Sequence, residues 1–152
     1  MIVRSYSPED LAEMTVLSAS MHAESPEHVH LEFSPNSVME IGDLCTTNPD
    51  FQCLVVRRKQ DSPIVGAIAG FVAPHFYGPD RYASDLIFYV YPPYRGSTAA
   101  ARLLASFEKW AQSRGAKRFQ PGSFTGIDAA RTAKFYRGMG FREAGTIFVK
   151  DL

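Results

Sequence analysis

A β-rich run that stops at two consecutive prolines constrains this sequence more than any other feature. Ala83–Tyr91 is rich in branched and aromatic residues, and Pro92-Pro93 must end this strand because neither nitrogen can donate to a β-ladder. The apolar spacing over Thr98–Ser113 then predicts a helix with one wide apolar face, and Arg118–Phe124 reads as the next strand. A strand, a helix and a strand in this order predict two parallel neighbours joined by a right-handed crossover.

The segments on either side of this unit alternate between strand and helix patterns. Before it, we predict strands at Ile2–Tyr6, Phe51–Arg57 and Ile64–Val72, and helices that begin at Ser7-Pro8 and Ser34-Pro35. After it, we predict a helix at Asp128–Met139 and a final strand at Phe141–Val149. The element order is therefore β-α-α-β-β-β-α-β-α-β. This order indicates one α/β (α+β) domain over residues 1–152, with a central mixed sheet and helices on both of its faces.

Length, charge and cysteine content narrow the functional classes. The 16 basic and 16 acidic side chains cancel, and the lack of a basic excess argues against a nucleic-acid partner. No apolar run suits a signal peptide or a membrane span, so we expect a cytoplasmic protein with no membrane partner. Cys45 and Cys53 fit neither a disulfide framework nor the spacing of a zinc site, so we expect no metal.

The turn that follows the two prolines has the residue types of a phosphate site. Arg95 carries a positive charge, hydroxyl donors follow it, and small side chains allow an anion to approach the free N–H groups of the first helical turn. The residues concerned are Arg95, Gly96, Ser97, Thr98, Ala99 and Ala100. The alternative is a plain polar turn that caps the helix.

Two motifs make the sequence resemble the GNAT superfamily of N-acetyltransferases. Val90-Tyr-Pro-Pro-Tyr-Arg-Gly-Ser-Thr-Ala-Ala100 is similar to the family's acetyl-CoA signature, with Arg95 at the Q/R position and Thr98 where glycine is usual. Ala133-Lys-Phe-Tyr-Arg-Gly-Met-Gly-Phe141 is similar to the C-terminal motif of the family. The short segments Glu24-Ser-Pro and Tyr94-Arg-Gly-Ser also resemble phage- or prophage-encoded members of the family.

The resemblance implies a fold, a co-substrate and a reaction. Acetyl-CoA would give its acetyl group directly to an amine in a ternary complex. The strand Ala83–Tyr91 would splay from its parallel neighbour, and the pantetheine arm would pair with the backbone of Phe88, Tyr89 and Val90. An N–H group near Val90 would polarise the thioester carbonyl, and the Arg95–Ala100 loop would hold the pyrophosphate. Tyr136 matches the tyrosine that protonates the leaving thiolate; a core aromatic is the alternative.

Two candidates are open for the base that deprotonates the amine. Asp85 is the only carboxylate on the central strand, but alternation places it on the face opposite Val90 unless a β-bulge shifts the register. A histidine of the polar segment His22–Phe33 is the other candidate. The residues of this segment that we expect along the acceptor site are Glu24, His30 and Glu32. The alternatives are structural: Asp85 would form an ion pair at the strand end, and the segment would be a surface loop.

Three functions stay open at the level of sequence. The first is an N-acetyltransferase that acts on a small-molecule or protein amine, and the second is a non-catalytic acyl-CoA-binding sensor or scaffold with the same fold. The third is a phage-linked interaction protein, which would need neither Arg95 nor Tyr136. The acceptor and the oligomeric state are also left open, although many relatives are homodimers.

Overall fold

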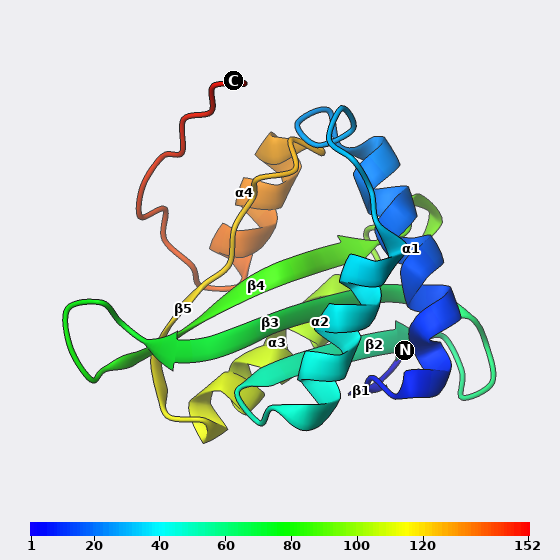
Figure 1. The fold of residues 1–152 in the computed structure, drawn as a ribbon, viewed down its shortest axis with the longest axis horizontal. Coiled ribbons are helices and arrows are strands. Elements are labelled where there is room, and N and C mark those ends of the chain that lie inside the picture. The colour runs from blue at the N-terminus through cyan, green and yellow to red at the C-terminus, as the bar shows by residue number, and fades with distance from the viewer.

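A single five-stranded sheet forms the centre of the molecule (Figure 1). The computed structural model describes residues 1–152. The strands lie in sequence order, and their bounds are β1 Ile2–Ser5, β2 Phe51–Arg57, β3 Ile64–Pro74, β4 Arg81–Val90 and β5 Ala116–Gln120. The first four strands pair antiparallel, whereas β5 runs parallel to β4. The predicted mixed sheet and its central parallel pair are therefore confirmed.

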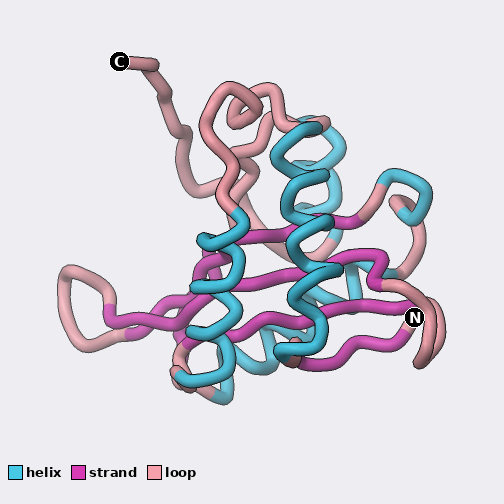
Figure 2. The backbone as a smooth tube through the Cα atoms, turned by 45° about the vertical axis from the view of Figure 1, so that its right-hand side comes forward, coloured by secondary structure: helices cyan, strands magenta, loops and turns pink.

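Helices cover both faces of this sheet. Their bounds are α1 Leu11–Glu24, α2 Pro35–Thr47, α3 Ala99–Ser113 and α4 Ala129–Gly138, with short 3-10 helices at Pro8–Asp10 and Pro92–Tyr94. The first two cross one face side by side (Figure 2), while α3 and α4 pack against the other. No helix is both long and apolar enough to cross a membrane.

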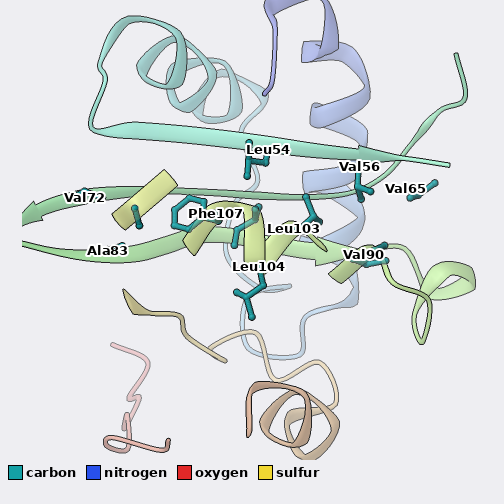
Figure 3. Close-up of a cluster of buried hydrophobic side chains, with 12 residues drawn as sticks. Leu54, Val56, Val65, Val72, Ala83, Val90, Leu103, Leu104 and Phe107 are labelled. Atoms are coloured by element: carbon teal, nitrogen blue, oxygen red, sulfur yellow. The ribbon is translucent and has the colours of Figure 1, made fainter. Parts of the chain in front are cut away.

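Two apolar clusters, one on each face, hold the layers together. On one face, Leu17 of α1 packs with Val55 and Ile87. On the other, Leu103 and Phe107 of α3 have no exposed surface and lie against strands β2, β3 and β4 (Figure 3). Because every central strand is apolar on both sides, the sheet is buried between the helices.

A buried carboxylate fixes the start of the chain to the sheet. Asp10 is only 2% exposed and accepts two 2.7 Å hydrogen bonds from Arg4 and one of 2.9 Å from Arg57. It also accepts the N–H of Ser7 at 3.0 Å, which caps the first turn. These partners, Arg4 first, hold the pKa of Asp10 well below its usual range.

The parallel strands separate after a short stretch of pairing. The last paired residues are Ser84 of β4 and Gln120 of β5, after which Pro121 ends β5. The β4 strand continues alone on this side as far as Val90. The splay that the family resemblance implied is therefore present, and it leaves the β4 edge from Asp85 to Val90 without a strand partner.

A β-bulge in β4 lies at the start of this free edge. Asp85 pairs with Gly70 and Ile87 pairs with Ala69, so Leu86 is the extra residue. A Cβ at Gly70 would collide with the carbonyl oxygen of Ser84. The bulge therefore depends on a glycine at position 70, which allows the two backbones to approach closely.

The predicted final strand at Phe141–Val149 is absent, and this prediction was wrong. Phe141 packs against Phe119 of β5 with ring centroids 5.5 Å apart, but the residues after it form no ladder and Phe148 is 91% exposed. Strand-forming residue types do not suffice here because a strand also needs a paired neighbour. The other predicted elements are present, with ends that differ by a few residues.

Candidate functional site

The free edge of β4 presents backbone donors to the gap between β4 and β5. Tyr91 donates its N–H to Val65 of the neighbouring β3 at 3.0 Å. Because N–H groups of an antiparallel strand point alternately to its two sides, the N–H groups of Val90 and Phe88 face away from β3. The edge of the gap therefore offers hydrogen-bond donors that no strand satisfies.

The loop from β4 to α3 contains a second group of free donors. Gly96 has a φ of +89°, a left-handed conformation that favours glycine. Ser97 is used within the loop, since its Oγ donates to Tyr94 and accepts the N–H of Ala99. The N–H groups without an acceptor in the protein are those of Gly96, Thr98, Ala100 and Ala101. Four free N–H groups at the start of a helix suit an anion.

The Arg95 side chain, however, is bound to other parts of the protein. Its Nη1 and Nη2 each lie 2.6 Å from an oxygen of Glu24, and its Nε donates to the Val90 carbonyl at 2.9 Å. Tyr89 donates its hydroxyl to the same carboxylate at 2.6 Å, and the guanidinium lies 5.2 Å from the Tyr89 ring centre. The bonds from Arg95, more than the one from Tyr89, hold the pKa of Glu24 below its usual range.

A different arginine, which the sequence did not point to, lies beside the loop between β4 and α3. The Nη2 atom of Arg131 is 3.5 Å from the position that a Cβ on Gly96 would occupy. Its side chain is exposed and forms no ion pair, while its N–H is capped by Asp128 at 3.2 Å. The available signal was topological: α3 and α4 both begin where the parallel strands β4 and β5 end, so their first turns lie at the same edge of the sheet.

The two candidate proton carriers both bind the backbone of one residue across the gap, Gly122. Gly122 donates its N–H to Asp85 at 2.8 Å, and Tyr136 donates its hydroxyl to the Gly122 carbonyl at 3.2 Å. Burial raises the pKa of Asp85 to about 6. Burial, with the nearby Asp85 charge second, also raises the pKa of Tyr136 above its usual range. Tyr136 therefore stays protonated at neutral pH, whereas Asp85 is mostly ionised.

The bulge at Leu86 decides the face on which Asp85 lies. Phe88, Val90 and Ala83 all belong to the cluster under α3. Asp85 shares a face with Ala83 by simple alternation, and the extra residue brings Phe88 and Val90 onto that same face. The β-bulge that Asp85 needs in order to lie on the same face as Val90 is therefore present.

The expected acceptor residues do not gather at one place. Glu24 lies at the end of β4 in its ion pair with Arg95, whereas Glu32 is exposed. His30 is also exposed and contacts Asp151 at 3.2 Å. The segment nevertheless borders the gap: the buried Ser25 donates its hydroxyl to Thr125 in the loop between β5 and α4 at 2.5 Å.

One family model matches most of the chain, and solved structures of low sequence identity share its fold. A model of the acetyltransferase (GNAT) family matches residues 15–141. An acetyltransferase from Trypanosoma brucei is 20% identical with a TM-score of 0.75, and the match covers 99% of both chains. A ribosomal-protein-alanine N-acetyltransferase from Brucella melitensis is 16% identical with a TM-score of 0.74 and full coverage of both chains, 100% each.

A third solved structure carries a ligand. AAC(6')-Iy, in complex with the bisubstrate analogue CoA-S-monomethyl-acetylneamine, is 13% identical with a TM-score of 0.78, covering 99% of this chain and 97% of that one. At such identities these likenesses establish the fold. No functionally curated protein matches the sequence closely enough to count as a relative.

Proposed function

This chain belongs to the GNAT family of acetyltransferases, and we propose that it passes the acetyl group of acetyl-CoA directly to a primary amine in a ternary complex. The observation that carries the proposal is the free edge of β4 beyond Ser84, with unpaired N–H donors at Val90 and at the start of α3. A peptide-like pantetheine arm can complete a strand edge, and a pyrophosphate suits the helix start.

The residues of the gap fit each part of this co-substrate. Phe88, Tyr89 and Val90 line the strand edge that would receive the pantetheine arm. The backbone of the loop from Gly96 to Ala100 would hold the pyrophosphate, and the unpaired Arg131 would add the positive charge. Acetyl-CoA supplies the thioester, and the Phe88 N–H, which lies farther from the pyrophosphate loop on the same edge, would stabilise negative charge on its carbonyl oxygen.

Two side chains are proposed to move protons. Asp85, with a pKa raised to about 6, is a carboxylate at neutral pH and can accept a proton from the acceptor amine. Tyr136, which stays protonated, can donate to the leaving thiolate in place of its present acceptor, the Gly122 carbonyl. Their common contact with Gly122 keeps both groups at the same end of the gap.

The charge distribution supports a cationic amine as the acceptor class. The sequence contains no lysine or arginine between Ser5 and Val56, a stretch that forms α1, α2 and the loop joining them. Relatives described as acting on aminoglycosides or on a ribosomal protein are consistent with amine acceptors. We propose that the amine enters beside the Ser25–Thr125 contact, where the segment that carries Glu24, His30 and Glu32 borders the gap.

The test combines binding with turnover. Acetyl-CoA at about 100 times its dissociation constant should stabilise the protein by about 2.7 kcal/mol, which raises the melting midpoint by roughly 5–10 °C. Release of the CoA thiol is then followed with neamine, spermine and a peptide with an N-terminal alanine as acceptors. Tyr136→Phe should lower kcat, whereas the exposed Tyr77→Phe is the matched control.

Each outcome has a clear meaning. Stabilisation and turnover support the proposal. Stabilisation without turnover across a broad amine panel would contradict the enzymatic reaction and leave the acyl-CoA-binding sensor. No stabilisation by acetyl-CoA or by other acyl-CoAs would contradict both and leave an interaction protein.

A further inference from the structure

The chain ends in a segment that the fold hardly holds, residues 141–152, which we call the tail. It contains no helix or strand. Beyond the N–H of Phe141, which donates to the Tyr136 carbonyl at 3.0 Å, the tail backbone forms no hydrogen bond with other backbone groups. Phe148 is 91% exposed and Val149 is 73% exposed, so its apolar side chains are not packed either. The tail can therefore take up other positions at little cost in free energy.

Both ends of the tail lie beside the gap between β4 and β5. At its start, the ring of Phe141 lies 5.6 Å from the ring of Tyr136, the proposed proton donor. Near its end, Asp151 contacts Nε2 of His30 at 3.2 Å, in the segment that borders the acceptor side. Figure 1 shows the tail, in red, running from α4 toward the end of the molecule that carries the loop between α1 and α2. Lys150, next to Asp151, therefore lies on the acceptor side.

We propose that the amine of Lys150 is an acceptor for the chain's own active site, so that the protein acetylates its tail. This self-acetylation rests on the proposed function, because it uses the same co-substrate, base and acid. It adds a modification site, Lys150, to the transfer of acetyl groups to separate amines.

The tail is long enough for this reaction. Lys150 lies nine residues after Phe141, and nine extended residues span up to about 30 Å. A domain of 152 residues has a radius of gyration of about 15 Å. With Phe141 held beside Tyr136, the Lys150 side chain can therefore reach the gap from the acceptor side.

The distribution of charge favours Lys150 at this place. The stretch between Ser5 and Val56 supplies no lysine or arginine, whereas Glu27 and Glu32 are exposed in the loop between α1 and α2. The Lys150 ammonium is exposed, so these carboxylates attract it with the modest strength of surface charges. Acetylation removes the positive charge, and the neutral tail is then no longer attracted to the acceptor side.

The remaining lysines are held in regular elements or in a tight turn. They are Lys59 between β2 and β3, Lys109 on α3, Lys117 on β5 and Lys134 on α4. Lys117 binds Asp80 at 2.6 Å, at the end of the sheet where β4 and β5 are still paired. Lys134 precedes Tyr136 by two residues, about 200° of helical turn, so it lies on the opposite side of α4. Lys150 is therefore the lysine that can move to the gap.

The transfer balances with the groups already described. Lys150 Nζ gives one proton to the Asp85 carboxylate and attacks the thioester carbonyl carbon, so that a C–N bond forms and the C–S bond breaks. The leaving thiolate takes the proton of Tyr136, and the second proton of the nitrogen restores Tyr136. The products are N-acetyl-lysine and CoA, with one proton passed from Asp85 to solvent.

Mass spectrometry of the full chain, incubated with acetyl-CoA and no other amine, tests the proposal. One acetyl group per chain should appear, and peptide mapping should place it on Lys150. Tyr136→Phe and Asp85→Asn should each slow this labelling on the order of 100-fold, the value of a positioned acid or base. Lys150→Arg should abolish it, whereas Lys134→Arg, which removes an exposed lysine of α4, is the matched control and should label at the wild-type rate.

The dependence on concentration shows that the reaction is intramolecular. A tethered acceptor has an effective concentration on the order of 1 mM, whatever the protein concentration. The first-order rate constant should therefore stay the same when the protein is diluted 100-fold, as expected for a linked acceptor, to about 1 μM. A free peptide with the sequence of residues 141–152, added at about 1 μM, should be acetylated about 1000-fold more slowly than the tail.

The results that overturn the proposal are distinct. Turnover of a separate amine without label on Lys150 would refute self-acetylation and leave the proposed function intact. Similar labelling of Lys150 and Lys134, unchanged by Tyr136→Phe, would indicate spontaneous chemical acetylation. A labelling rate constant that falls in proportion to protein concentration would refute the intramolecular reaction. A wild type that neither binds acetyl-CoA nor acetylates any amine would refute the proposed function and self-acetylation with it.

Discussion

Asp85→Asn should make the protein more stable and less active at the same time. Burial raises the pKa of Asp85 from 3.8 to about 6, a shift of about 2 units. A raised folded-state pKa means that the protonated form favours folding: its contribution is complete below about pH 3.8 and is lost as pH rises through about 6. Ionised Asp85 therefore lowers the free energy of unfolding at pH 7 by up to about 3 kcal/mol.

The asparagine variant avoids this cost and keeps the nearest contact. Its side-chain oxygen can still accept the Gly122 N–H, which lies 2.8 Å from the Asp85 carboxylate. The melting midpoint should rise by roughly 5–10 °C at pH 7 and by little at pH 4. The exposed Asp80→Asn is the control for removal of a carboxylate, because Asp80 is 67% exposed in its pair with Lys117.

Activity should move in the opposite direction. If Asp85 is the base, kcat/KM of the wild type rises with pH through an apparent pKa near 6, and Asp85→Asn removes both the rise and most of kcat. A gain in melting midpoint over the wild type that is no larger at pH 7 than at pH 4 would refute the burial argument. A variant with wild-type kcat would refute the base.

Three further predictions follow from single contacts. Arg131→Ala should weaken acetyl-CoA binding about tenfold by calorimetry, the value of one charge-assisted hydrogen bond, without changing the melting midpoint of the free protein because the side chain is exposed; unchanged affinity would remove Arg131 from the site. Gly70→Ala should cost about 3 kcal/mol in urea unfolding because its Cβ meets the Ser84 carbonyl; a stable variant would contradict the close approach. Asp10→Ala should cost about 3 kcal/mol because Arg4 and Arg57 lose the buried carboxylate that they share, although Arg57 keeps its pair with Glu13; since the Asp10 pKa is lowered, this difference should shrink as pH falls below about 4.

The order of elements was predictable because local signals coincide with it. Pro92-Pro93 stop a strand in any context, and a proline after Ser7 or Ser34 begins a helix, as observed. The final strand was not predictable in the same way. Phe141–Val149 has suitable residues, but whether it pairs depends on a neighbouring strand edge that its own sequence does not describe.

The candidate site was predictable where it consists of backbone and unpredictable where it depends on distant partners. The turn at Arg95–Ala100 and the free donors follow from local sequence. The partner of Arg95 does not follow from local sequence. Glu24 is the last residue of α1, and α2, β2, β3 and β4 lie between the two residues along the chain. The face of Asp85 likewise depends on a bulge that Gly70 permits from the neighbouring strand.

The distinction between backbone and side chain also accounts for the departure from the family motif at Thr98. Thr98 has φ −76° and ψ 0°, a right-handed conformation open to any residue, whereas the left-handed position of the loop falls at Gly96, with φ +89°. The backbone therefore does not require glycine at position 98. The Thr98 N–H also stays free for an anion, as it would with glycine. The substitution consequently gives no reason to separate this chain from the catalytic members of its family, and turnover becomes the deciding measurement.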